Sequence, residues 1–238
     1  MINNLCVGFF ENLSRIFTSS EYMGMIFNGL WCTILISIGA SIVGIILGTL
    51  VAIVKIIPSK SIIMRILNVI CDIYTTIFRG TPMALQLFIM AFVIFAIRGF
   101  PMEIVAILAF GINSGAYVSE SIRGGILSVD KGQTEAGRAL GLTYSKTMSK
   151  IVIPQAIKNV IPSIGNEIIA LIKETSIVSM VGGLYDLTLT AKIIGGGNEL
   201  ANFLAPMFVV ALFYLAIVYL LTFIVKIIER RLRAGDNR

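Results

Sequence analysis

Five long apolar stretches divide the chain, with shorter polar segments between them. They cover approximately residues 24–57, 61–97, 102–122, 160–181 and 203–228. A helix needs about 20 predominantly apolar residues to cross the hydrocarbon core of a bilayer. Each stretch reaches that length, so the pattern predicts an all-α integral membrane protein with about five transmembrane helices.

The second stretch is too long for a single crossing, and Arg79, Gly80, Thr81 and Pro82 interrupt it. Because Pro82 lacks a backbone N–H and Gly80 loosens the backbone, we expect the helix to break at membrane depth. Thr81 is placed to bond backbone groups that the break sets free. Broken helices are typical of transport pathways.

Small residues recur every four positions along one face of the first stretch, at Ala40, Gly44, Gly48 and Ala52. In lipid, helices associate mainly by close packing, which small residues permit. The motif therefore predicts a close helix contact. A contact within the chain and a seam between two subunits both fit it, and we interpret the motif as structural.

The longest polar interruption is residues 135–154, EAGRALGLTYSKTMSKIVIP. We expect two short helices here. Asp130 caps the first, with Gln133 reaching back as in a capping box, and Gly141 supplies a left-handed end. Thr143 caps the second, and Pro154 ends it and bends the chain toward the next span.

Composition supports a membrane protein, since 57% of residues are hydrophobic and 13% are charged. Mean hydropathy is +0.93, and soluble domains carry about 25% charged residues. Residues 1–22 lack the features of a signal peptide, so we expect a short interfacial helix. Cys6, Cys32 and Cys71 have unrelated spacings and predict apolar packing, neither a disulfide framework nor a metal site. Histidine is absent.

Positive charge predicts the orientation of the chain. With the N-terminus outside, five crossings leave only Arg15, Arg98 and Lys192 on the outer side, the last in the polar, Gly-rich segment 185–202, which we expect to be an outer loop. Arg79 and Lys173 lie within the spans, and the other Lys and Arg residues lie in the cytoplasm. This asymmetry matches the positive-inside rule and argues against nucleic acid as the partner. It divides the chain into an interfacial segment (1–22), a transmembrane domain (23–228) with a cytoplasmic loop (123–158), and a basic cytoplasmic tail (229–238).

The spacing of Glu135, Ala136, Gly141, Ile151 and Pro154 resembles the EAA loop of ABC importer permeases. In that loop Glu-Ala-Ala is followed at fixed distances by Gly and by Ile-x-Leu-Pro. This chain departs from the pattern at Gly137, in place of the second Ala, and at Ile153, in place of Leu. Both changes in volume are small.

Two further stretches are similar to the polar amino-acid uptake branch of these permeases, the histidine, glutamine and arginine type. They are residues 78–82 (FRGTP) with 86–88 (QLF), and residues 165–167 (GNE) with 173–176 (KETS). The resemblance extends from about Gly24 to the C-terminus. Thr76 stands where relatives often have an acidic residue three positions before the arginine.

The resemblance implies a type I ABC importer permease fold in a bacterial inner membrane. It implies an ATPase subunit that binds the EAA helices, a second identical or related permease subunit, and an extracytoplasmic binding protein that delivers an amino acid. ATP and Mg would be bound by the ATPase, because this chain has no phosphate-binding Gly-x-x-x-x-Gly-Lys-[Ser/Thr] motif and no cofactor site of its own. The expected ATPase-coupling residues are Glu135, Ala136, Gly137, Leu140, Gly141, Ile151 and Pro154.

Charged residues at membrane depth need partners or a wet cavity, because burying them alone is costly. Those in this chain are Asp72, Arg79, Glu120, Glu167, Lys173 and Glu174. An amino-acid zwitterion requires an acidic group and a cation, and Arg79 and Glu167 are the first choices. The alternative is that Arg79 pairs with Asp72, that Lys173 snorkels, and that Glu120 is solvated or bridges to the loop. The expected substrate pathway comprises Arg79, Thr81, Pro82, Gln86, Asn113 and Glu167.

Two other classes of function are possible for a membrane protein of this kind. A stand-alone secondary transporter or channel would be expected to contain inverted repeats, and none is visible. A membrane enzyme would need a Ser/His, Cys/His or metal cluster, and none is present in the sequence. Only the permease interpretation requires a stoichiometric ATPase, so co-purification discriminates among the three.

Overall fold

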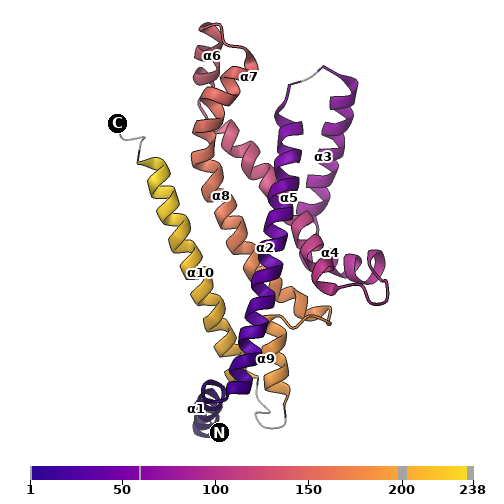
Figure 1. Ribbon diagram of the computed structural model, residues 1–238, viewed down its shortest axis with the longest axis vertical. Helices are drawn as coiled ribbons and strands as arrows, with labels where there is room; N and C mark the ends of the chain where they lie inside the picture. Colours follow the sequence, from indigo (N-terminus) through magenta and orange to yellow (C-terminus); the bar gives the residue numbers. More distant parts are fainter. Residues whose placement is uncertain (1, 59, 198–202, 235–238) are drawn as a thin grey trace.

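The computed structural model describes residues 2–58, 60–197 and 203–234, and the regular structure in these residues is helical (Figure 1). The α-helices are α1 (Ile2–Thr18), α2 (Ser20–Ile56), α3 (Ile62–Gly80), α4 (Met83–Ile89), α5 (Met102–Leu127), α6 (Lys131–Ala139), α7 (Tyr144–Thr147), α8 (Ile153–Glu174), α9 (Leu187–Gly196) and α10 (Leu204–Arg233). Two π-helical turns, η1 (Met90–Ile94) and η2 (Met148–Val152), and the 3₁₀ helix η3 (Thr175–Met180) complete the list.

Three of the described helices, α2, α5 and α10, are long and apolar enough to cross a membrane alone. A fourth span is the pair α3 and α4–η1, which is bent by 109° at the break. Helix α8 has 22 residues but a more polar sequence, and it lies beside α5 and α10. These five segments form the predicted bundle.

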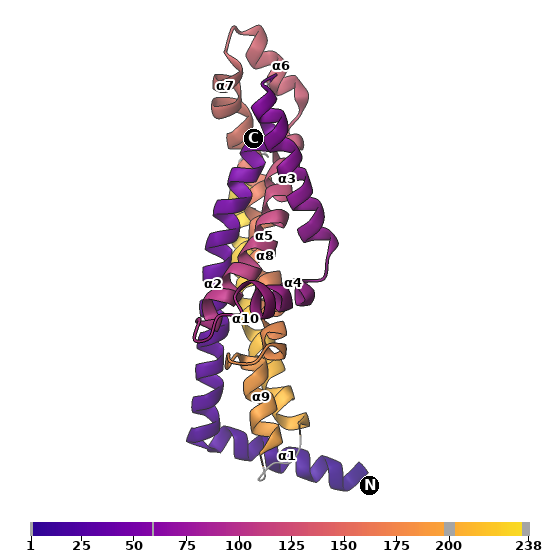
Figure 2. The ribbon, with the colours of Figure 1, turned by 90° about the vertical axis from the view of Figure 1, so that its right-hand side faces the viewer.

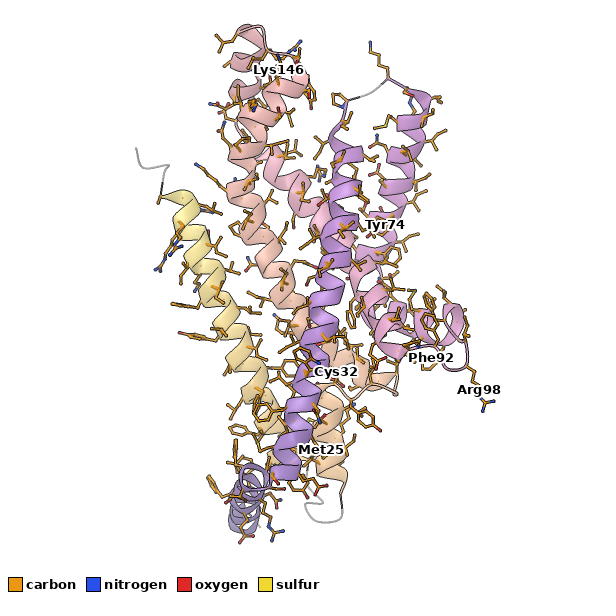
Figure 3. All side chains as sticks on the ribbon, in the orientation of Figure 1. Met25, Cys32, Tyr74, Phe92, Arg98 and Lys146 are labelled. Carbon is orange, nitrogen blue, oxygen red and sulfur yellow. The ribbon has the colours of Figure 1, made fainter. Side chains whose placement is uncertain are left out.

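The helix break falls where the sequence predicts it, at Thr81 and Pro82 between α3 and α4. Beyond it, α4 and η1 project sideways from the bundle and end near Arg98, whose side chain points away from the other helices (Figure 3). Helix α1 lies across one end of α2, and helices α6 and α7 lie at the other end of the molecule (Figure 2). The Ser19 hydroxyl caps α2 by accepting the N–H of Tyr22, so the span begins earlier than expected.

One expectation about the loops was wrong. Residues 185–202 were expected to form a loop, but residues 187–196 form α9. Both carboxylate oxygens of Asp186 cap its first turn, and Leu187, Ala191 and Ile194 are buried. Residues 198–202 lie outside the described part. Helix α10 continues to Arg233, so residues 229–233 of the expected basic tail are helical, and residues 235–238 are also outside that part. Cys32 and Cys71 are unpaired, and the side chain of Cys6 is not described.

The small residues of α2 pack against α5 within the same chain. A Cβ added at Gly44 would meet the Ser114 side chain at 2.9 Å, and one at Gly48 would lie 2.7 Å from the Gly115 carbonyl oxygen. The contact is reciprocal, since a Cβ at Gly111 of α5 would lie 2.7 Å from Val43. The motif is therefore structural, and it brings the two backbones unusually close.

We predict that Gly48→Ala weakens this contact. The added methyl group meets a carbonyl and the branched side chain of Val118, so the protein should lose roughly 1–3 kcal/mol of stability. Thermal denaturation in detergent measures the loss. Gly24→Ala is the matched control on the same helix, because a Cβ there meets nothing within 4 Å. Equal melting of the two variants would contradict the prediction.

Candidate functional site

Helices α6 and α7 form a pair that projects from one end of the bundle, with Lys146 near its tip (Figures 1 and 3). The first arm begins as predicted, with Asp130 accepting the N–H of Gly132 at 2.6 Å. The expected capping box is wrong. The side-chain oxygen of Gln133 instead accepts the amide of Gln155 of α8 at 3.3 Å, because the second arm brings that amide within reach.

Gly141 ends the first arm in the left-handed conformation, with φ +80°, as predicted. The Leu142 N–H donates to the Gly137 carbonyl and the Gly141 N–H to the Arg138 carbonyl. These two hydrogen bonds define a Schellman motif, which satisfies the last carbonyls of a helix. The Arg138 side chain also donates to the Leu142 carbonyl at 2.8 Å, so a side-chain hydrogen bond stabilises the turn in addition to the two backbone hydrogen bonds.

The second arm is continuous with a membrane helix. Thr143 caps it as predicted, accepting the N–H of Lys146. The expectation that Pro154 ends this helix was wrong, since α7 passes through the π turn into α8 and helix continues from Tyr144 to Glu174. In the π turn the N–H of Ile153 bonds to the Met148 carbonyl, five residues earlier, and Pro154 follows this turn directly, where the regular helical hydrogen-bond pattern is already interrupted.

The expected coupling residues divide into an exposed surface and an inner contact. Gly137 is buried, because a Cβ there would lie 2.8 Å from Thr147 and 3.0 Å from Ile151 of the second arm. Glycine at this position therefore lets the arms touch. The exposed members are Glu135, Ala136, Leu140, Gly141 and Pro154, and 80% of Leu140 is exposed at the turn.

A buried hydrogen-bond network holds the helix break. Gln86 donates its amide to the carbonyls of Phe78 and Thr81 and to the Thr81 hydroxyl, at 2.7–3.1 Å. Asn113 of α5 donates to the Phe78 carbonyl and to the side-chain oxygen of Gln86, at 3.0 and 2.9 Å. The Thr81 hydroxyl also donates to the Ile77 carbonyl. The network satisfies backbone carbonyls that the break leaves without helical partners.

Lys55 is the centre of an ion network that joins α2, α3 and α5. Its ammonium lies 2.9 Å from Asp72 and 2.7 Å from Glu120, and Glu120 also binds Arg123 at 2.7 Å. The suggested pairing of Arg79 with Asp72 was therefore wrong. Sequence reasoning missed this role, because Lys55 follows an apolar run and looked like an orientation signal. Glu120 bridges to α2, with a side chain only 16% exposed.

Arg79 and Glu167 come from different helices and face the same part of α5. The Arg79 guanidinium lies 5.4 Å from the centre of the Tyr117 ring, a cation–π distance. Glu167 of α8 is half-buried, and Ser114 of α5, Arg79 and Glu174 lie near enough to affect the charge of its carboxylate. Ser114 and Tyr117 are three residues apart on one helix face. Arg79, Thr81 and Pro82 are exposed, and Gln86 and Asn113 are buried.

Within residues 2–58, 60–197 and 203–234, no group of three His, Cys, Asp or Glu side chains is placed to hold a metal ion. The features that stand out are a broken membrane helix, charged side chains at membrane depth, and a helix pair that projects from one end. Together they define a helical membrane protein of the transport class.

Comparison with known proteins identifies the family. Residues 44–234 match the model of the binding-protein-dependent transport system inner membrane component, and the chain belongs to this family. It is 42% identical to the arginine transport system permease protein ArtQ of Bacillus subtilis, over 89% of this chain and 94% of that protein. It is 44% identical to the putative glutamine transport system permease protein GlnP of Rickettsia bellii, over 87% and 92% of the two chains.

A solved structure supports the same assignment. The crystal structure of an amino acid ABC transporter with histidines contains a chain that matches with a TM-score of 0.80 and 34% identity, over 89% of this chain and 95% of that one. The predicted type I ABC importer permease fold is confirmed. The protein is an inner membrane permease component of an ABC transporter.

We predict that Gln86→Glu destabilises the helix break. A carboxylate keeps the size and the acceptor for Asn113, but it cannot donate to the carbonyls of Phe78 and Thr81. The cost should be roughly 2–3 kcal/mol, seen as a lower melting temperature. Gln133→Glu is the control, because Gln133 is exposed and its side chain acts as an acceptor. A melting temperature equal to wild type for Gln86→Glu would contradict the role assigned to this amide.

Proposed function

We propose that this chain imports polar amino acids as the membrane-spanning subunit of an ATP-driven importer. The observation that carries the proposal is the projecting helix pair, whose second arm continues as one helix into α8 and so toward Glu167. A partner that binds the pair would act directly on a helix of the transmembrane bundle. The family membership and the names of the relatives support this function.

The partners follow from the same reasoning. An ATPase subunit binds the exposed side of α6 and α7, where Glu135, Ala136 and Leu140 are exposed. This subunit binds ATP and Mg. A second permease subunit completes the pathway, and an extracytoplasmic binding protein delivers the amino acid. The N-terminus lies outside and the helix pair and tail lie in the cytoplasm, as the distribution of Lys and Arg favours. Residues 23–228 form the permease domain.

The substrate pathway runs along α5 between Arg79 and Glu167. A carboxylate binds well to a guanidinium, and an α-ammonium binds well to a carboxylate. The relatives are named for arginine and for glutamine, which share this zwitterionic part and differ in the length and charge of their side chains. We therefore assign recognition of the zwitterion to Arg79 and Glu167, and the shape of the path to the bend made by Thr81, Pro82, Gln86 and Asn113.

Glu167→Gln should abolish uptake, because it removes the negative charge that binds the ammonium while it keeps the size of the side chain. Loss of a charge-assisted hydrogen bond costs about 1.5–3 kcal/mol, so we expect uptake at least tenfold lower. Reconstituted complex is assayed for uptake and for ATP hydrolysis stimulated by arginine or glutamine, and both responses should fall.

Glu103→Gln is the matched control, since Glu103 is an exposed acidic residue in the first turn of α5. Its uptake should equal that of wild type. Unchanged transport by Glu167→Gln, in a complex that assembles normally, would exclude Glu167 as a substrate contact. Absence of a stoichiometric ATPase after purification would instead favour a secondary transporter or channel.

Gly141→Val should uncouple ATP hydrolysis from uptake. Its φ of +80° is disfavoured for a β-branched residue. A left-handed non-glycine residue costs roughly 1–2 kcal/mol, enough to lower the population of the turn about 5- to 30-fold. Uptake per ATP hydrolysed is the measurement. Gly141→Asn is the control, because asparagine tolerates this conformation, and normal coupling in the valine variant would count against the proposed contact.

A further inference from the structure

Helix α3 lies at the edge of the bundle (Figures 1 and 2). Of its 19 residues, which the structure describes completely, Cys71 and Thr75 are the buried ones. Ile63 and Ile73 on its other side are more than half exposed. The end of this helix nevertheless carries Arg79, the proposed contact of the substrate carboxylate. The position of Arg79 therefore depends on the side chains that hold α3 to its neighbours.

The ammonium of Lys55 is bonded in three directions. Its nitrogen lies 2.9 Å from a carboxylate oxygen of Asp72, 3.3 Å from the Thr75 hydroxyl and 2.7 Å from Glu120. An ammonium has three donors, so each donor has a partner. Asp72 and Thr75 belong to α3, and Glu120 belongs to α5. Because Lys55 itself is in the last turn of α2, one side chain fixes α3 relative to two other helices.

The carboxylate of Glu120 is itself held in place. Arg123 donates to its Oε2 through two nitrogens, at 2.9 and 2.7 Å, and leaves Oε1 for Lys55. Two cations face two carboxylates, so the network is neutral and has no charge left for a ligand. The side chain of Asp72 is 63% exposed, whereas those of Lys55 and Glu120 are 12% and 16% exposed. The link to α3 can therefore be removed at Asp72 without leaving a buried charge unpaired.

The network and Arg79 lie on the same face of α3. Asp72 precedes Arg79 by seven residues, which is two helical turns and about 10.5 Å along the axis. On α5, Glu120 follows Tyr117 by three residues, one turn of that helix. The Arg79 guanidinium lies 5.4 Å from the centre of the Tyr117 ring. The ion network and the cation–π contact are thus successive links between the same two helix faces.

We propose that Lys55 is a positioning residue for substrate binding, which holds α3 so that Arg79 lies beside Tyr117. This inference rests on the proposed contact between Arg79 and the substrate carboxylate. An orientation signal would need only the charge of Lys55, and it leaves the three bonds of the ammonium without a purpose. The Tyr74 hydroxyl also donates to a carbonyl of α5, but this bond leaves α2 unconnected to α3.

The test is calorimetric titration of arginine and of glutamine into the permease purified with its co-purifying subunits. Lys55→Met should raise the Kd roughly tenfold, because misplacing a functional group by about 1 Å costs up to about 100-fold. Asp72→Asn should raise the Kd by a similar factor, and it leaves Lys55 paired with Glu120. The double variant should bind no more weakly than either single variant, because both act through one ion pair.

Two control variants separate a positioning role from a general effect of charge or stability. Lys55→Arg keeps a cation between the two carboxylates and should restore the affinity of wild type. A cavity of about 340 Å³ borders Lys55 and gives room for the larger side chain. Lys60→Met removes the same charge from an exposed position between α2 and α3, and should leave the Kd unchanged. Equal affinities of Lys55→Met and wild type would overturn the proposal.

Arg79→Gln distinguishes this inference from the proposed function. It should weaken binding, and adding Lys55→Met should then weaken it no further, because Lys55 acts through Arg79. Weaker binding by Arg79→Gln, with normal binding by Lys55→Met, would refute the positioning role alone. Normal binding by Arg79→Gln would refute the proposed substrate contact and this inference with it. Additive losses in the double variant would show that Lys55 acts independently of Arg79, and the proposal would fail.

Discussion

The close contact between α2 and α5 is the constraint on which the rest of the bundle depends. In lipid there is little hydrophobic gain from helix association, so the two backbones must approach until dispersion contacts suffice. Glycines on both helices permit that approach, Gly44 and Gly48 on α2 and Gly111 on α5. Helix α3 is attached to these two helices through the hydroxyl of Tyr74 (Figure 3), which donates to a carbonyl of α5, and through the ion pair of Asp72 with Lys55 of α2.

The break between α3 and α4 is possible because α5 supplies a hydrogen-bond donor for the freed backbone carbonyls, which lipid cannot do. A carbonyl freed at membrane depth must find a donor within the protein. Asn113 of α5 and Gln86 of α4 provide those donors for Phe78 and Thr81, and they also bond to one another. The bend exposes Arg79 beside Tyr117, on the α5 surface that also carries Ser114. The packing seam thus determines where a charged residue can remain at membrane depth.

Local signals in the sequence predicted most of the fold. Hydrophobic length located the spans, and Pro82, Gly141, Thr143 and Asp130 act through their own backbone neighbours, so their effects are visible without tertiary structure. The errors arose where a distant residue decides the outcome. Gln133 forms a hydrogen bond with Gln155, and Asp72 pairs with Lys55 where Arg79 had been suggested as its partner. Helix α9 is stabilised by packing against α2 and α10. No local pattern contains these partners.

The continuity of α7 with α8 changes how a movement of the helix pair reaches the membrane. A helix that ended at Pro154 would transmit motion through a loop, whereas the π turn keeps the second arm joined to α8. This helix is not uniformly stiff, because Pro162 lies inside it and removes one backbone hydrogen bond. Glu167 lies beyond Pro162, so a displacement of the pair would move the part of α8 before Pro162 directly and Glu167 through a weakened turn. Bending at that turn is where coupling between the pair and the pathway would be gained or lost.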